Sequence, residues 1–268
     1  MIEKGLRILA ERGPGGVLLA LKRLALPLRA GVLPLCVARV RHRRGLEIGG
    51  PSAIFGNKGL LPLYARVGHL DNCNFSAHTV WVEHHEEGAT FRFDRRRPAG
   101  RQFIAEATRL EPIASKSCDF VLSSHALEHC ANPLQALREI KRVLADSGTL
   151  ILVLPHREGT FDHRRPVTSL QHLIEDDRRG MAEDDLTHLP EILALHDFER
   201  DPEAGGPQAF EARARSNAEN RCLHHHVFDE HLAAAMVTEA GLDVLAVEFS
   251  PPMHIIVVAG KGVPLQSP

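Results

Sequence analysis

The sequence lacks paired cysteines. Its five cysteines are scattered and none belongs to a CxxC motif: Cys36, Cys73, Cys118, Cys130 and Cys222. This spacing argues against a disulfide framework and against a structural zinc site, and it indicates a reducing compartment. We therefore expect a cytoplasmic protein.

Aromatic residues and long apolar runs are also scarce. The 268 residues include one Trp, one Tyr and 11 Phe, so few rings are available to stack on a flat ligand. No apolar run is long enough to span a bilayer. The formal net charge of -2 gives no reason to expect nucleic-acid binding.

The first 44 residues differ from the rest. They carry ten Lys and Arg against two acids, and Lys22, Arg23 and Arg29 interrupt their apolar stretch. That interruption argues against a signal peptide. Two interpretations stay open: a helical cap that packs on the main domain, or a basic amphipathic segment that lies on an anionic membrane. We divide the chain into this arm, 1–44, and one domain, 45–268.

From residue 45 on, short apolar runs alternate with helical periodicity, which predicts an α/β domain. The expected strands are 46–48, 65–70, 102–107, 118–124, 149–154, 243–249 and 254–260. A helix is predicted over 132–148, with Asn132 as N-cap, Pro133 at the first position and Gly148 after its end. A second helix is predicted over 228–241. A polar, irregular insertion occupies about 156–222.

The first strand ends in the glycine-rich turn GLEIGGPS, residues 45–52. Two glycines let the backbone approach a ligand closely. The turn lacks the GxGxxG spacing, and Pro51 removes an N–H group that a phosphate site would use. The turn therefore suits a ligand without phosphates.

Together, several segments resemble the class I S-adenosylmethionine-dependent methyltransferases. They are the GLEIGGPS turn, Asp71 after the second strand, the Glu106-Ala107 pair, the block CDFVLSSHALEHCANPLQALREIKRVLADSGTLILVLP and the closing helix-strand-strand. The resemblance covers about 45–155 and 228–260. It implies a Rossmann-like sheet of seven mostly parallel strands, with the helical arm before it and the polar insertion after strand five.

The resemblance also implies the cofactor site, at the carboxyl ends of the strands. Asp71 would hold the ribose hydroxyls, and Glu106 or the backbone of Ala107 would face the adenine. Glu47 would bind or orient the amino-acid end. The remaining cofactor residues would be the turn and the end of the fourth strand: Gly49, Gly50, Pro51, Ser52, Ser124 and His125.

The acceptor is predicted from the second half of the chain, where histidines stand beside acids. An alcohol needs a positioned base or a metal to lose its proton. His156 directly follows the fifth strand and is the candidate general base, although a histidine at a strand end can also be purely structural. The polar insertion favours a hydroxyl-rich acceptor, and it resembles, more weakly, O-methyltransferases that act on sugars and bacterial methylated polysaccharides.

Acids and histidines of the insertion could bind a divalent ion, with Mg²⁺ as the candidate. The expected ligands are Asp162, His163, Asp184 and His188, and the expected substrate contacts are Glu183, Glu191 and His225. The alternative is that these acids form a solvated face. His225 belongs to a run of three histidines, which could instead only cap the junction before the next helix.

Three hypotheses follow for function. The first is O-methylation of a saccharide hydroxyl. The second is methylation of a small metabolite or a lipid-linked precursor at a membrane, with the basic arm as anchor. The third is a cofactor-binding protein without catalysis. A homodimer is a further assembly that we consider.

Overall fold

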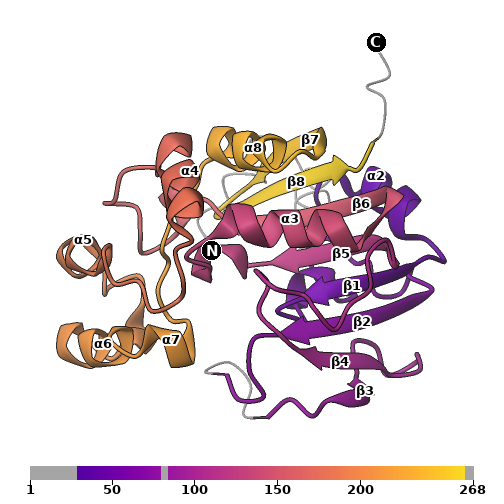
Figure 1. The fold of residues 1–268 in the computed structure, drawn as a ribbon, viewed down its shortest axis with the longest axis horizontal. Coiled ribbons are helices and arrows are strands. Elements are labelled where there is room, and N and C mark those ends of the chain that lie inside the picture. Colours follow the sequence, from indigo (N-terminus) through magenta and orange to yellow (C-terminus); the bar gives the residue numbers. More distant parts are fainter. Residues whose placement is uncertain (1–28, 80–83, 263–268) are drawn as a thin grey trace, which may run out of the picture.

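The computed structural model describes residues 29–79 and 84–262. Its centre is an eight-stranded sheet in the order β3-β4-β2-β1-β5-β6-β8-β7 (Figure 1). The strands are β1 (Arg44–Ile48), β2 (His69–Asn74), β3 (Gly88–Phe91), β4 (Gly100–Ile104), β5 (Cys118–Ser124), β6 (Leu144–Pro155), β7 (Asp243–Ser250) and β8 (His254–Gly260).

The sheet is mostly parallel. Strands β4, β2, β1, β5 and β6 run in one direction, and β8 is antiparallel to β6 and to β7. Short β3 pairs antiparallel with β4 at the edge. Without β3, the order is that of the Rossmann-like methyltransferase sheet, which confirms the predicted fold class. The eighth strand was not predicted, because four residues give too short a pattern.

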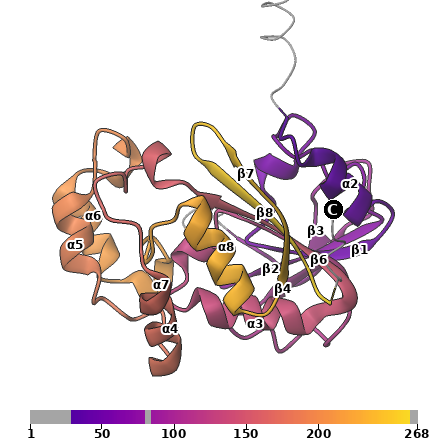
Figure 2. The same ribbon diagram turned by 90° about the horizontal axis from the view of Figure 1, so that it is seen from above.

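Helices cover both faces of the sheet (Figure 2). One core contains apolar residues of α3 (Pro133–Val143) and α8 (Glu230–Glu239), and the other contains Cys36 and Val40 of α2 (Leu33–Val40). Strand β6 serves both cores, since Leu152 belongs to the first and Ile151 to the second. This alternation is the two-residue period of a strand.

At the two ends of α3, one predicted helix boundary is confirmed and the other is wrong. Asn132 caps the helix by accepting a hydrogen bond from the N–H of Gln135 at 2.9 Å, as predicted. The helix stops at Val143, because β6 begins at Leu144. The prediction that Gly148 follows the helix end is therefore wrong.

Strand β2 lies four residues later than predicted. Its interior holds Asn72, whose Nδ2 donates to the carbonyl of Gly50 at 3.1 Å and to Oε1 of Gln102 at 2.8 Å. These partners allow polar residues in a central strand, where the sequence pattern alone favours an apolar run.

The insertion after β6 is helical. It contains α4 (Leu170–Arg179), α5 (Leu189–Leu195), α6 (Pro207–Ala214) and α7 (Asn217–Asn220) (Figure 1). A small core of its own holds α5, α6 and the following segment together: Leu189, Ile192, Ala204, Phe210, Ala214 and Leu223. The insertion is thus a compact unit and not an irregular loop.

Residues 1–28, the larger part of the predicted basic arm, lie outside the described residues. Of the rest of the arm, α2 packs on the sheet. The N–H groups of Gly31 and Val32 donate to the carboxylate of Glu248 at 2.8 and 2.7 Å. In the described ranges, no helix is long and apolar enough to cross a bilayer.

Candidate active site

A cavity of about 730 Å³ opens at the carboxyl ends of the parallel strands. The ends of β1, β2, β4, β5 and β6 contribute one wall, and the insertion contributes the other. A cavity of this size fits a small-molecule ligand. It lies where ligands bind in open α/β sheets.

The glycine turn after β1 forms part of the cavity wall, through Gly49, Gly50, Pro51 and Ser52. Gly49 has φ +79°, a left-handed conformation that side chains rarely adopt. A Cβ on Gly50 would lie 2.3 Å from the carboxyl carbon of Glu47. Both glycines are therefore required where the backbone faces the cavity.

Glu47 does not line the cavity, so of its two predicted roles, to bind or to orient the amino-acid end of the cofactor, only the indirect one stays a prediction. It is buried below the turn, where its carboxyl group accepts from the N–H of Ser52 at 3.0 Å and from the hydroxyl of Tyr64 at 2.9 Å. Burial raises the pKa of Glu47 to about 8. Glu47 instead holds the turn in shape.

Asp71 is also not at the cavity, because β2 ends at Asn74 and not near residue 70. Asp71 lies early in the strand, with Arg44 at 3.0 Å and His69 at 2.7 Å. Its predicted ribose contact is wrong. Asn74 holds the corresponding position at the strand end, lines the cavity and donates to the carbonyl of Gly50 at 3.2 Å.

The end of β4 supplies Ala105, Glu106 and Ala107 to the cavity, where the predicted adenine residues were expected. Arg221 of the insertion reaches across to this end. Its guanidinium pairs with Glu106 and lies 4.8 Å from the ring centre of Phe75. The insertion therefore closes over the cofactor end.

Ser124 and His125 line the cavity after β5, as predicted. Nε2 of His125 lies 3.0 Å from Nδ1 of His254 on β8, and Nδ1 lies 3.4 Å from the carboxylate of Glu128. Glu128 is 1% exposed and lines the cavity. Both carboxylate oxygens are buried, and at 3.4 Å the contact with His125 is an ion-pair contact and not a close hydrogen bond.

His156 does not line the cavity, and its predicted position beside the reacting methyl group is wrong. Pro155 lines the cavity, and the next side chain in a strand points the other way. The imidazole of His156 lies 3.1 Å from the carboxylate of Glu230 and packs on Phe249.

The four predicted metal ligands do not meet. Asp162 binds Arg165 and His224, whereas His163 binds Asp197 at 2.7 Å. Asp184 is exposed in the loop before α5, and His188 lies 3.0 Å from His172. The joint site is wrong because neighbouring side chains in these turns point to different partners.

Of the predicted substrate residues, only Glu183 lines the cavity. It accepts from the N–H of Ala131 at 3.2 Å, and burial raises its pKa to about 7. Glu191 instead binds Nε of Arg165 at 2.8 Å. His225 is buried against Asn217, with its Nε2 3.1 Å from Nδ2 of the amide. The predicted placement of these last two at the substrate is wrong.

The sequence reasoning missed His224, which does line the cavity. Its Nδ1 lies 2.5 Å from Oδ2 of Asp162. Burial opposes the charged imidazole, but the carboxylate of Asp162 outweighs this and raises the pKa of His224. An imidazole oriented by a buried carboxylate is the arrangement of a general base. The triple-histidine run was the only signal, and it did not say which ring faces the cavity.

Glu128, His129 and His224 form a polar group in the cavity, with one ligand atom of each within 4.8 Å of the others. Burial favours neutral Glu128, but its interaction with His125 and the charges of the nearby histidines outweigh burial and lower its pKa. Burial and His224 lower the pKa of His129 to about 4. At neutral pH the group therefore combines a carboxylate with imidazoles.

Comparison with known families agrees with this geometry. Residues 62–152 match the family model described as a methyltransferase domain. The matched segment contains β2, β4 and β5, whose ends line the cavity. No curated protein matches the chain.

Solved structures of methyltransferases are similar to the chain over most of its length. One is an S-adenosylmethionine-dependent methyltransferase from Mesorhizobium loti, with 13% identity, TM-score 0.49, and 86% of this chain and 96% of that chain covered. Another, from Aquifex aeolicus, has 13% identity, TM-score 0.45, and 85% and 87% covered.

The fold and the family match together support S-adenosylmethionine-dependent methyltransferase activity. The residues present fit that cofactor. The glycine turn exposes backbone, and the side chains of Asn74 and Glu106 lie at the next two strand ends. They offer an amide and a carboxylate to a ligand that carries hydroxyl and amino groups.

Proposed function

We propose that the protein is an S-adenosylmethionine-dependent O-methyltransferase whose acceptor is a polar, hydroxyl-rich molecule such as a saccharide. The observation that carries the proposal is the Asp162–His224 pair, whose imidazole lines the same cavity as the glycine turn. An alcohol needs such a base, whereas thiols and amines need little activation.

Polar side chains that the insertion contributes to the cavity wall support a hydroxyl-rich acceptor. Glu183, Arg200, Asp201 and Glu203 of the insertion line the cavity together with the group around Glu128. These side chains offer both donors and acceptors to hydroxyl groups. A quinone or a lipid tail would instead favour an apolar wall.

In this proposal each residue of the site has a separate role. The cofactor, when bound, supplies a methyl group on a sulfonium. His224 takes the acceptor's hydroxyl proton on Nε2 while Asp162 holds the ring through Nδ1 and stabilises the imidazolium. Glu128 accepts a hydrogen bond from the acceptor and orients it.

A second form of the proposal uses Glu128, His129 and His224 as ligands of a divalent ion, for which Mg²⁺ is the first candidate. The observation in its favour is the buried carboxylate of Glu128, which lies close to His129 and His224 and is 3.4 Å from His125. The test is to chelate the enzyme and add back Zn²⁺ and then Mg²⁺. The metal form predicts that turnover is lost and returns with Mg²⁺. Full turnover after chelation would exclude it.

The cofactor itself is tested by titration calorimetry with S-adenosylmethionine. We expect binding at micromolar to sub-millimolar concentration. We also expect Asn74→Ala to weaken binding roughly 5-fold, because a hydrogen-bonding side chain at the site contributes about 1 kcal/mol. Asp71→Ala is the matched control and should bind as the parent does, since Asp71 lies outside the cavity.

Failure of the parent protein to bind at millimolar cofactor would refute the methyltransferase proposal. Equal weakening by Asp71→Ala and Asn74→Ala would refute the assignment of Asn74. Circular dichroism of both variants excludes misfolding as the cause.

A further inference from the structure

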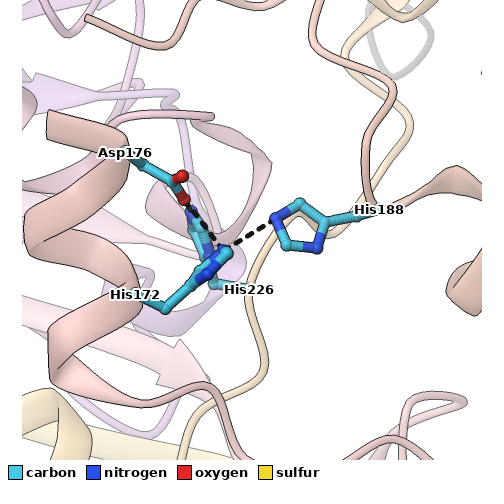
Figure 3. A group of neighbouring side chains, drawn as sticks. All are labelled: His172, Asp176, His188 and His226. Atoms are coloured by element: carbon cyan, nitrogen blue, oxygen red, sulfur yellow. Dashed lines mark hydrogen bonds and ion pairs between the residues drawn. The ribbon is translucent and has the colours of Figure 1, made fainter. Parts of the chain in front are cut away.

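A second group of histidines lies in the insertion, outside the cavity: His172, Asp176, His188 and His226 (Figure 3). His172 and Asp176 stand four residues apart on one face of α4. His188 is the residue before α5, and His226 belongs to the segment before α8. Three segments far apart in the sequence therefore contribute to one cluster.

The side chains converge closely. One ligand atom of each lies within 4.8 Å of the others. Nε2 of His172 lies 3.0 Å from Oδ2 of Asp176 and 3.0 Å from Nε2 of His188. Ligands of a tetrahedral ion with bonds of about 2.0 Å are about 3.3 Å apart, so small side-chain rotations would complete the site.

The rings meet at their edges and do not stack. The three pairs of ring planes make angles of 73°, 67° and 75° at centroid distances of 4.9, 5.8 and 5.6 Å. Stacked rings would point their nitrogens apart. Edge contacts allow several nitrogens to face a common point, and Figure 3 shows Asp176 and His188 both directed toward His172.

Burial provides an independent observation. His226 is 1% exposed and its Nε2 lies 3.2 Å from the carbonyl oxygen of Ala131, to which it can donate. The same Nε2 lies 3.9 Å from Oδ2 of Asp176, and Nδ1 is buried with no hydrogen-bond partner among the described residues. An ion held by Nδ1 would leave Nε2 on the carbonyl of Ala131, an arrangement that is common in metal-binding histidines.

Charge also agrees. Burial lowers the pKa of His188, and it lowers the pKa of His226 well below its ordinary value. Neutral imidazoles carry the lone pair that a metal needs. Burial raises the pKa of Asp176, and a cation beside it would favour the ionised carboxylate.

We propose that His172, Asp176, His188 and His226 bind one transition-metal ion, Zn²⁺ being the best match, in a closed structural site. Three imidazoles and one carboxylate suit zinc better than Mg²⁺. None of the four residues lines the cavity, so the ion does not meet the acceptor. The cysteine spacing argued against a structural zinc site, but it has no bearing on histidine ligands.

The ion would fix the wall of the cavity. His224, two residues before His226, lines the cavity, and Glu183 lines it five residues before His188. A bound ion ties both segments to α4. This inference does not depend on the proposed function, because metal content and stability report on it directly.

The test compares the chelated full-length chain with the variant His172→Ala/His188→Ala. These two ligands are the less buried ones, so their removal should leave the fold intact. His231→Ala on the exposed side of α8 is the matched control. The measurements are Zn²⁺ stoichiometry by calorimetry, the visible spectrum of bound Co²⁺, and Tm.

We expect one Zn²⁺ per chain at the cluster in the parent and in His231→Ala, with a tetrahedral Co²⁺ spectrum. Zn²⁺ at about 100 times its Kd should raise Tm by roughly 5–10 °C. The double variant should lose this ion and this shift, whereas His224→Gln should keep both. No Zn²⁺ binding by the parent, or equal binding by the double variant, would overturn the proposal.

Discussion

Replacing His224 with Gln should reduce turnover about 10²–10⁴-fold, the usual loss when a positioned general base is removed. Glutamine keeps much of the side-chain volume but cannot take a proton. In the proposal, His224 belongs to the group around Glu128 that faces the acceptor, and not to the residues that fit the cofactor. The calorimetric affinity for S-adenosylmethionine should therefore change little. The measurement is kcat with labelled cofactor and a panel of mono- and oligosaccharide acceptors.

His156→Gln is the matched control. It removes the histidine that directly follows β6, which faces Glu230 and Phe249 and not the cavity. We expect nearly full turnover. Normal turnover in His224→Gln would contradict the role of His224 as base. A large loss in His156→Gln alone would return that role to His156, the residue first predicted from the sequence.

The pH profile separates a base from a structural histidine. A base works in its neutral form, so kcat should rise with pH through the raised pKa of His224. Asp162→Asn removes the carboxylate that raises this pKa. The acidic limb of the profile should therefore move to lower pH, with a lower plateau because the ring is held less well. An unmoved limb would contradict the role of Asp162.

Replacing Arg165 with Met should destabilise the protein by about 3–5 kcal/mol, the cost of leaving a buried charge without its partner. Arg165 is 1% exposed and pairs with Asp162 at 3.0 Å and with Glu191 at 2.8 Å. It also donates to the carbonyl oxygens of His224 and His225 at 2.8 and 3.1 Å. The free energy of unfolding in urea is the measurement.

Arg164→Met is the neighbouring control. Arg164 is half exposed, and its pair with Asp197 at 3.2 Å lies near the surface. We expect a loss of ~1 kcal/mol or less, as for other exposed ion pairs. A similar loss of unfolding free energy in both variants would show that the ion pairs of Arg165 contribute no more than an exposed ion pair does. A selective loss would identify it as the residue that holds Asp162 and the histidine segment together.

Local sequence signals determined much of the fold. The cap at Asn132, the glycine turn after β1, and the strands Cys118–Ser124 and His254–Gly260 depend on residues next to one another in the chain. Such patterns reflect backbone preferences and burial period, which act over a few residues. They were enough to predict an α/β domain, and the resemblance to methyltransferases added the Rossmann-like order of the sheet and the expected cofactor end.

The side of the cavity that holds the proposed base could be predicted only with the tertiary structure. Asp162 and His224 are 62 residues apart, and Arg221 meets Glu106 across 115 residues. No local sequence pattern predicts contacts between residues that are so far apart in the chain. The sequence by itself determined most of the strands and the glycine turn that lines the cavity, because these are short-range features. Only the packing of the insertion decided that His224, and not His156 or His225, faces the cavity, since a one-residue step along an extended segment reverses the side of a side chain.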